Sequence, residues 1–141
     1  MDRIEADLLI PGKGDPVRDG TVIIDGPRIR YAGPAQAAPE TPGAIRHQVT
    51  AVLPGLWDCH GHFFGVRSFD INTVALEHVA VRSARCTRDL RAALDAGITS
   101  VREVGGLGVY LARAVAEGAI EGPAIYAAGS ALGITGGHAD L

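Results

Sequence analysis

The sequence predicts an α/β fold, and three observations support that prediction. Residues 4–52 contain short apolar or alternating segments separated by turns rich in proline and glycine. From residue 73 onwards, a helical pattern, a glycine and a β-branched strand follow one another, an alternation expected of a parallel barrel or a doubly wound sheet. The composition, 47% hydrophobic and 21% charged over 141 residues, is that of a soluble α/β domain.

Short strands account for the N-terminal part of the chain. Gly26-Pro27 forms a turn between two β-branched segments, which predicts a hairpin. Residues 34–43 contain prolines and alanines without a periodic pattern, and they predict an irregular connection. We therefore predict strands over residues 4–10, 21–25, 28–33 and 45–52.

Two histidines lie at the end of the next predicted strand. Pro54-Gly55 interrupts the preceding strand, and an extended run resumes over residues 56–62. Residues two apart on a strand share one face, so His60 and His62 would point into the same small volume. Two neutral imidazoles can ligate a divalent metal such as Zn²⁺. A solvated strand face is the alternative interpretation of the bare pair.

The rest of the chain predicts two helices and two strands. Apolar residues recur at spacings of three and four over residues 73–96, with Thr87 as a candidate cap for a separate segment and Gly97 as the end. The arginines from Arg67 to Arg91 predict a solvated or partner-facing surface rather than a phosphate site. We predict a strand over residues 98–104, a helix over 109–117 closed by Gly118, and a strand over 123–129.

Three motifs resemble signatures of the amidohydrolase superfamily. Residues 54–62 resemble "PG(L/F)(I/W)D-x-H-x-H", and residues 97–106 resemble "G-(I/V)-T-(S/T)-V-R-D-x-G-G" with Glu103 in place of the usual aspartate. Residues 135–140 resemble "TGGHG(D)" of the imidazolonepropionase-like and Xaa-Pro dipeptidase-like branch, with Ala139 where glycine is common. The N-terminal strands resemble the small β-sandwich beside the barrel in this family.

The resemblance implies a (β/α)8 TIM barrel, with residues 53–141 as its first three βα units and residues 1–52 as part of a β-sandwich domain. Such a barrel takes about 250 residues, so a chain of 141 residues cannot contain all of it. We expect the N-terminal part of a longer enzyme, one half of a split enzyme, or a gene remnant. The family's sandwich is completed by C-terminal strands, so its apolar inner face would lie open here.

The resemblance also implies the roles of individual residues. His60 and His62 would bind one or two divalent metal ions, which we expect to be zinc. His138 and Glu103 would be substrate-binding residues; the alternative for Glu103 is a salt bridge with Arg102 or hydrogen bonds within the loop. The other metal ligands and an aspartate base are expected beyond residue 141, so this segment should contain no catalytic residue.

The implied function is metal-dependent hydrolysis of an amide or peptide C–N bond in a dipeptide, an acyl amino acid or a cyclic amide. The metal would polarise the carbonyl and lower the pKa of a water from about 15.7 towards 7, and His138 would stabilise the oxyanion. Two histidines do not fill a tetrahedral shell, so the chain alone is expected to be inactive. The alternative is a non-catalytic fragment or interaction module that needs a partner chain to complete the barrel.

Charge and cysteine content restrict the partners. A net charge of −3 without a basic stripe argues against nucleic acid and anionic membranes. Without a signal peptide or membrane span, we expect the cytoplasm. We expect Cys59 to pack away from the histidine pair, with a redox or ligand role as the alternative. The expected partners are a small-molecule or short-peptide substrate, the remainder of the barrel in the same or a second chain, and a second copy in a homo-oligomer.

Overall fold

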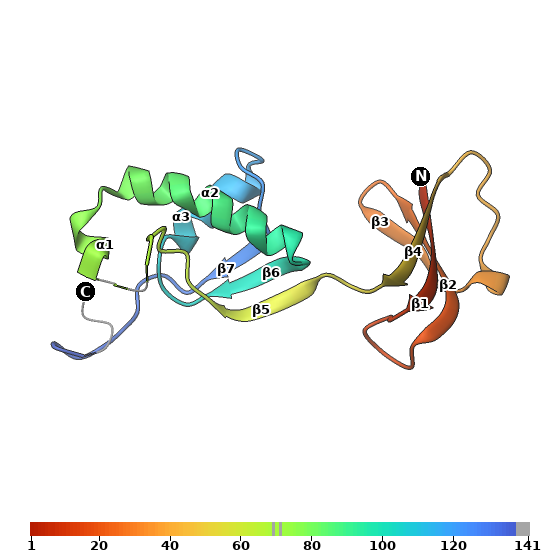
Figure 1. Ribbon diagram of the computed structural model, residues 1–141, viewed down its shortest axis with the longest axis horizontal. Helices are drawn as coiled ribbons and strands as arrows, with labels where there is room; N and C mark the ends of the chain where they lie inside the picture. The colour runs from red at the N-terminus through yellow and green to blue at the C-terminus, as the bar shows by residue number, and fades with distance from the viewer. Residues whose placement is uncertain (69, 71, 138–141) are drawn as a thin grey trace. The chain divides into compact units, whose positions relative to one another are not determined.

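The chain forms two compact units, Met1–Pro54 and Gly55–Leu141, in a computed structural model that describes residues 1–68, 70 and 72–137 (Figure 1). The division falls after Pro54, whereas the sequence predicted it after Val52. The second unit contains the predicted histidine pair, and the first unit contains four strands and one 3₁₀ turn in the described residues.

The first unit is a four-stranded sheet with the strand order β3-β2-β1-β4. β2 pairs antiparallel with both β1 and β3, and β4 pairs in parallel with β1. In the described residues this unit contains one sheet, so the second layer of a sandwich stays a prediction. The strands are β1 (Asp2–Leu9), β2 (Val17–Asp25), β3 (Arg28–Pro34) and β4 (Ile45–Val52).

Burial in this sheet is concentrated on its two central strands. Val22 and Ile23 of β2 are buried, whereas Ile29 and Ile45 on the edge strands are exposed. The irregular connection after β3 starts with a single 3₁₀ turn, Ala35–Ala37. Buried Arg3 donates a hydrogen bond from Nη1 to the carbonyl oxygen of Pro39 (2.9 Å), which ties this connection to β1.

The second unit is a three-stranded parallel sheet with the order β5-β6-β7. A short helix and a long helix lie between β5 and β6, and one helix connects β6 to β7, which is the alternation of helix and strand predicted from the sequence (Figure 1). None of the helices in the described residues has the length and apolar character needed to cross a membrane. The elements are β5 (Leu56–Gly61), α1 (Asn72–Leu76), α2 (Val79–Asp95), β6 (Ile98–Glu103), α3 (Gly108–Ala116) and β7 (Ala124–Ala127).

The two longer helices cover only one face of this sheet. Val101 of β6 is buried in a cluster with side chains of α2 and α3, namely Cys86, Leu90 and Leu111, together with Phe63 and Leu107. The opposite face presents Trp57 and Tyr126, which stack at 5.0 Å and are 55% and 56% exposed. Parallel sheets are normally covered on both faces. In the part of the chain that the structure describes, this one is covered on a single face.

The predicted cap at Thr87 is wrong. Thr87 lies inside α2, where its hydroxyl donates to the carbonyl oxygen of Ala84 (2.7 Å). The helical region is instead interrupted before α2, and Nδ1 of His78 caps α2 by accepting the N–H of Ala80 (3.2 Å). Threonine can bond to a preceding carbonyl within a helix, so its residue type alone does not identify a helix start.

Candidate metal centre

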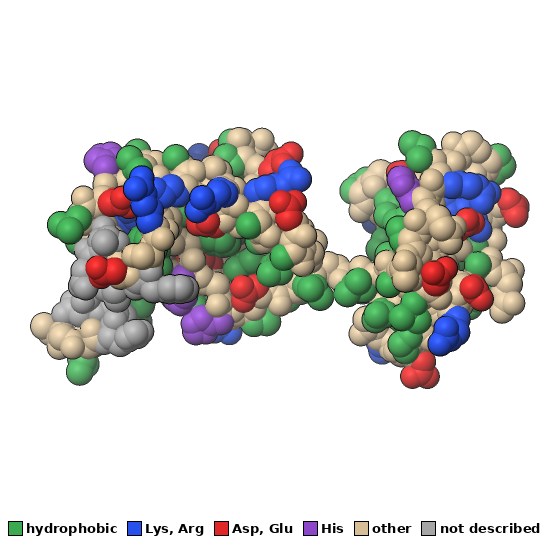
Figure 2. Space-filling view, in the orientation of Figure 1, with side chains coloured by type: hydrophobic (Ala, Val, Ile, Leu, Met, Phe, Trp, Pro, Cys, Tyr) green, Lys and Arg blue, Asp and Glu red, His purple; other side chains and the backbone are tan. Residues whose placement is uncertain are grey.

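His60 and His62 lie together at the carboxyl end of β5. Both side chains are exposed, and their ring centroids are 5.2 Å apart with the ring planes at 69°. Gly61 between them faces the helix-covered side, because a Cβ there would lie 2.7 Å from Cγ1 of Val101. Figure 2 shows histidine side chains in two places on this unit, one on the side of α2 and one at the opposite edge. The two imidazoles therefore share the uncovered side of the sheet.

An irregularity in β5 lies between Asp58 and Gly61, and this interval includes His60. Asp58 is paired with Val101 and Gly61 with Glu103, so β5 contains one residue more than β6 between these two pairs. A bulge of this kind redirects side chains and leaves a backbone donor unpaired. Oδ1 of Asp58 accepts the N–H of His60 (3.0 Å), which satisfies a donor in the bulge.

His62 has one defined tautomer. Its Nδ1 lies 2.8 Å from the carbonyl oxygen of Gly105. A carbonyl oxygen only accepts, so Nδ1 carries a proton, and in the neutral imidazole Nε2 then keeps its lone pair available for a metal. The ring of Phe64 stacks on the imidazole at 5.3 Å and 8°. These two contacts fix both the orientation of the ring and the nitrogen that it offers.

Two glycines aim the carbonyl group that His62 contacts. Gly105 and Gly106 have backbone φ values of 141° and 143°, which residues other than glycine rarely adopt. Two backbone hydrogen bonds fasten this turn to the end of β5, from Val104 N to Gly61 O (3.0 Å) and from Leu107 N to Phe63 O (2.9 Å). Backbone hydrogen bonds thus join the loop after β5 to the loop after β6, next to the two histidines.

Two arginines of α2 bind the loop that follows His62. Arg82 donates from Nε to the carbonyl oxygen of Phe64 (2.9 Å), and Arg85 donates to that of Gly65 (3.3 Å). Arg85 also pairs with Glu77, and this hydrogen bond lowers the pKa of Glu77 below its usual value. The arginines from Arg67 to Arg91 were predicted to form a solvated or partner-facing surface, whereas Arg82 and Arg85 contact the loop after His62. Arg82 and Arg85 are three residues apart, about one helical turn, and this spacing was the sequence signal that both lie on one face of the helix.

Glu103 is fully buried, with 0% of its surface exposed. Its Oε1 accepts the N–H of Phe63 at 3.4 Å, and its Oε2 has no partner among the described residues. Arg102 is exposed and precedes Glu103 on the strand, so the two side chains point to opposite faces. Of the alternatives in the sequence analysis, the structure therefore shows the loop hydrogen bond and not the Arg102 salt bridge. Complete burial also argues against direct substrate contact.

The remaining predicted residues give mixed outcomes. His138, predicted to bind substrate, lies outside the described residues. Cys59 is exposed, so the prediction that it packs is wrong; on an uncovered sheet face, strand position alone does not bury a side chain. Cys86 is buried, and this burial raises the pKa of its thiol to about 11.

The donors present fit a divalent metal as part of a ligand set. Imidazole nitrogen suits zinc and other late transition metals, and His62 presents a free Nε2. Within residues 1–68, 70 and 72–137, no group of three histidine, cysteine, aspartate or glutamate side chains is arranged to hold a metal. His60 and His62 would thus supply two donors to a metal site, and the further donors would have to come from outside the described residues.

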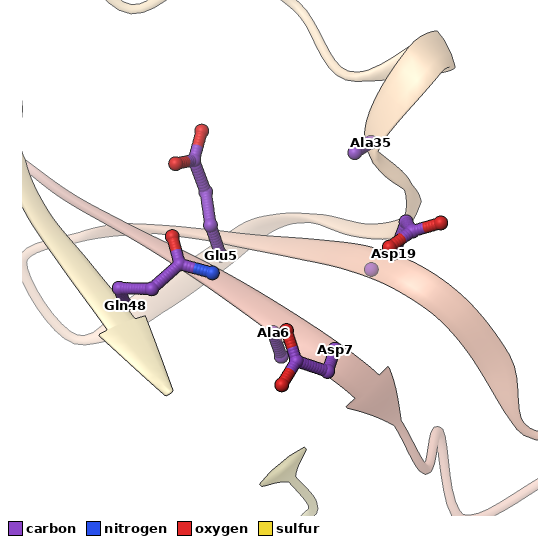
Figure 3. Close-up of a pocket in the computed structure, with 7 residues that line it drawn as sticks. Glu5, Ala6, Asp7, Asp19, Ala35 and Gln48 are labelled. Atoms are coloured by element: carbon purple, nitrogen blue, oxygen red, sulfur yellow. The ribbon is translucent and has the colours of Figure 1, made fainter. Parts of the chain in front are cut away.

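A separate pocket lies on the N-terminal sheet (Figure 3). Its acidic side chains do not converge, since Glu5 points away from Asp7 in Figure 3. Glu5 is also neutralised by ion pairs with Arg3 and Arg46, each at 3.0 Å. The histidine pair is therefore the stronger candidate. The pocket is lined by Glu5, Ala6, Asp7, Asp19, Gly20, Ala35 and Gln48.

Comparison with known proteins relates the chain to hydrolases. No family model matches it. It is 38% identical over 143 residues to ochratoxinase of Aspergillus niger, a match that covers 98% of this chain and 30% of that protein. It is 34% identical over 106 residues to imidazolonepropionase of Streptomyces coelicolor, covering 72% of this chain and 26% of that protein. The chain thus spans about 30% of the length of the curated relatives it matches.

Solved structures give the same result. The crystal structure of A. niger ochratoxinase matches with a TM-score of 0.88 and 37% identity, over 99% of this chain and 33% of that chain. A prolidase complexed with N-methylphosphonate-L-proline matches with a TM-score of 0.84 and 31% identity, over 99% of this chain and 34% of that chain. Both units of the chain therefore have counterparts in these enzymes.

Proposed function

Because the chain belongs to the amidohydrolase superfamily, we propose that it is the N-terminal part of a metal-dependent enzyme that hydrolyses an amide or peptide C–N bond. The observation that carries this proposal is the histidine pair at the end of β5, with His62 held in the tautomer that offers Nε2. The relatives' names, which include ochratoxinase and prolidase, support hydrolysis as the reaction class.

His60 and His62 are the residues that would hold the metal, which we propose to be one or two zinc ions. Bound there, the metal would polarise the scissile carbonyl and lower the pKa of a water from about 15.7 to about 7. The chain itself orients the ligands. The carbonyl oxygen of Gly105 accepts a hydrogen bond from Nδ1 of His62, and Oδ1 of Asp58 accepts a hydrogen bond from the backbone N–H of His60.

The uncovered face of the sheet supports the proposal of a barrel. Trp57 and Tyr126 are large, apolar and about half exposed, and they lie on the same face as the histidines. In a (β/α)8 barrel, helices cover the outside of the sheet and side chains fill its inside. We propose that this face is the barrel interior, that residues 53–141 form its first three βα units, and that the remaining strands come from the same or a second chain.

Substrate contacts would come from loops at the carboxyl ends of the strands. His138 follows β7 in sequence, and we propose it as a hydrogen-bond donor to the substrate or to the developing oxyanion. The proposed substrates are dipeptides, acyl amino acids or cyclic amides.

A non-catalytic interaction module is the second candidate. The observation that favours it is the exposed Trp57–Tyr126 face together with a metal-ligand set that is incomplete in the described residues. In that case the face would bind a partner chain and the histidine pair would bind no metal. Metal binding therefore distinguishes the two candidates.

The test is a zinc titration of the purified full chain against a chelator that competes for zinc. We expect wild-type protein to bind zinc and the double variant His60→Ala/His62→Ala to lose that binding. His47→Ala is the matched control, because His47 is an exposed histidine on β4 that pairs with Asp2. Equal zinc affinity in the double variant and in the control would overturn the proposal.

A further inference from the structure

Glu103 is a buried acid that the proposed chemistry does not use. It is the last residue of β6, none of its surface is exposed, and Oε2 has no partner among the described residues. Burying a carboxylate without full hydrogen bonding is costly, so such a group requires an explanation in the surrounding structure.

Two glycines leave the space that this carboxylate occupies. A Cβ on Gly106 would lie 2.5 Å from Oε1 of Glu103, and a Cβ on Gly108 would overlap Oε2. Gly108 is the first residue of α3, where alanine has the higher helix propensity. The glycine at this position is explained by the space that Glu103 needs.

Contacts of Glu103 lead directly to His62. Its Oε1 accepts the N–H of Phe63, the residue after His62. The carbonyl oxygen of Phe63 accepts the N–H of Leu107, which closes the turn that contains Gly105. The carbonyl oxygen of Gly105 in turn accepts the Nδ1 proton of His62. Glu103 thus lies between the strand that carries the histidine and the turn that orients it.

We propose that Glu103 is a positioning residue for His62. Its carboxylate accepts the N–H of Phe63 and fills the space beside Gly106 and Gly108. The turn therefore keeps its shape, and the carbonyl group of Gly105 stays directed at Nδ1 of His62. Through these contacts Glu103 sets the tautomer of His62 and leaves Nε2 available for a metal. The metal part of this inference rests on the proposed function, whereas the tautomer is a property of the metal-free chain.

The first test compares Glu103→Ala and Glu103→Gln with Glu117→Ala, an exposed glutamate that pairs with Arg113. The ¹⁵N chemical shifts of the His62 ring, measured without metal, report which nitrogen carries the proton. We expect one tautomer in wild type and Glu117→Ala, and a mixture in Glu103→Ala. Zinc affinity should fall by about 10- to 100-fold in Glu103→Ala, as for other groups that orient a ligand. Glu103→Gln keeps an acceptor oxygen for Phe63 and should lose less.

A double-mutant cycle keeps the proposal testable if Glu103→Ala does not fold. Gly108→Ala should weaken zinc binding in the wild-type background, because its Cβ displaces the carboxylate. In the Glu103→Asp background the side chain is one methylene shorter, so Gly108→Ala should have little further effect. Contacting residues give non-additive effects of this kind. Additive effects on zinc affinity would overturn the proposal.

The two proposals fail in distinguishable ways. If wild-type protein binds no zinc but Glu103→Ala changes the His62 tautomer, the proposed function is wrong and the positioning role stands. If Glu103→Ala and Glu117→Ala show the same His62 ring shifts, the positioning role is wrong whatever the zinc affinity.

Discussion

The Nδ1 atom of His62 donates a hydrogen bond to the carbonyl oxygen of Gly105, 2.8 Å away and 43 residues later in the chain. This bond joins the loops that follow two neighbouring parallel strands, β5 and β6. Active sites of parallel α/β folds form where the carboxyl ends of strands meet. The bond therefore links the architecture of the sheet to the metal-binding chemistry that we propose for His62.

Replacing Gly105 should weaken metal binding. Gly105→Ala places a side chain at φ 141°, a conformation that costs about 1–3 kcal/mol, and relaxation of the turn would rotate the carbonyl away from His62. We expect zinc affinity to fall by about 10- to 100-fold. Gly118→Ala is the control, since Gly118 also has a positive φ (73°) but closes α3. Equal zinc affinity in the two variants would contradict the role of Gly105.

Removing Arg82 should loosen the loop after His62. Arg82→Met keeps the apolar stem but leaves the carbonyl oxygens of Phe64 and Val74 without their donor. We expect the free energy of unfolding to fall by about 1–3 kcal/mol and amide exchange at Gly65 and Val66 to become faster. Arg88→Met on the exposed side of α2 should change the stability by less than about 0.5 kcal/mol. Unchanged exchange in Arg82→Met would show that the loop does not depend on this arginine.

The Glu77–Arg85 pair should make stability depend on pH in the acid range. The hydrogen bond from Arg85 holds the pKa of Glu77 below its usual value of 4.5. A carboxyl with a lowered folded-state pKa contributes stability that is fully present above its unfolded-state pKa and is lost as the pH falls through the folded-state value. The stability difference between wild type and Glu77→Gln should thus be constant near neutral pH and shrink below 4.5. Urea denaturation at a series of pH values measures it, and a difference that persists at low pH would contradict this account.

The two cysteines should differ in reactivity. Cys59 is exposed, whereas burial raises the pKa of the Cys86 thiol to about 11 and removes it from solvent. At mildly alkaline pH a thiol reagent should modify Cys59 quickly and Cys86 only after unfolding. Cys59→Ser should then show no rapid reaction under native conditions. Rapid modification of that variant would mean that Cys86 is accessible.

Local patterns predicted the elements better than the contacts between them. The bounds of β4 were predicted to the residue, and Gly97 ends the α2 region with φ 82° as expected of a helix-terminating glycine. These features depend on a few adjacent residues. The interruption before α2 was missed because a histidine, rather than the expected threonine, caps that helix.

The site was predictable only in part, for a related reason. His60 and His62 lie together because strand geometry places residues two apart on one face. The burial of Glu103 and the loop contacts of Arg82 depend on residues 40 and 18 positions away in sequence, and no local pattern encodes them. The glycines at positions 106 and 108 were the available signal for a buried side chain nearby, since both leave space for Glu103.

Native mass spectrometry of the isolated protein tests the central claim most directly, with wild type and His60→Ala/His62→Ala measured side by side. We predict that wild-type protein retains one or two zinc ions, that a second polypeptide or further sequence completes the particle, and that the variant has lost the metal. A wild-type particle that contains the completing polypeptide or further sequence and is nevertheless metal-free in the presence of zinc would contradict the account.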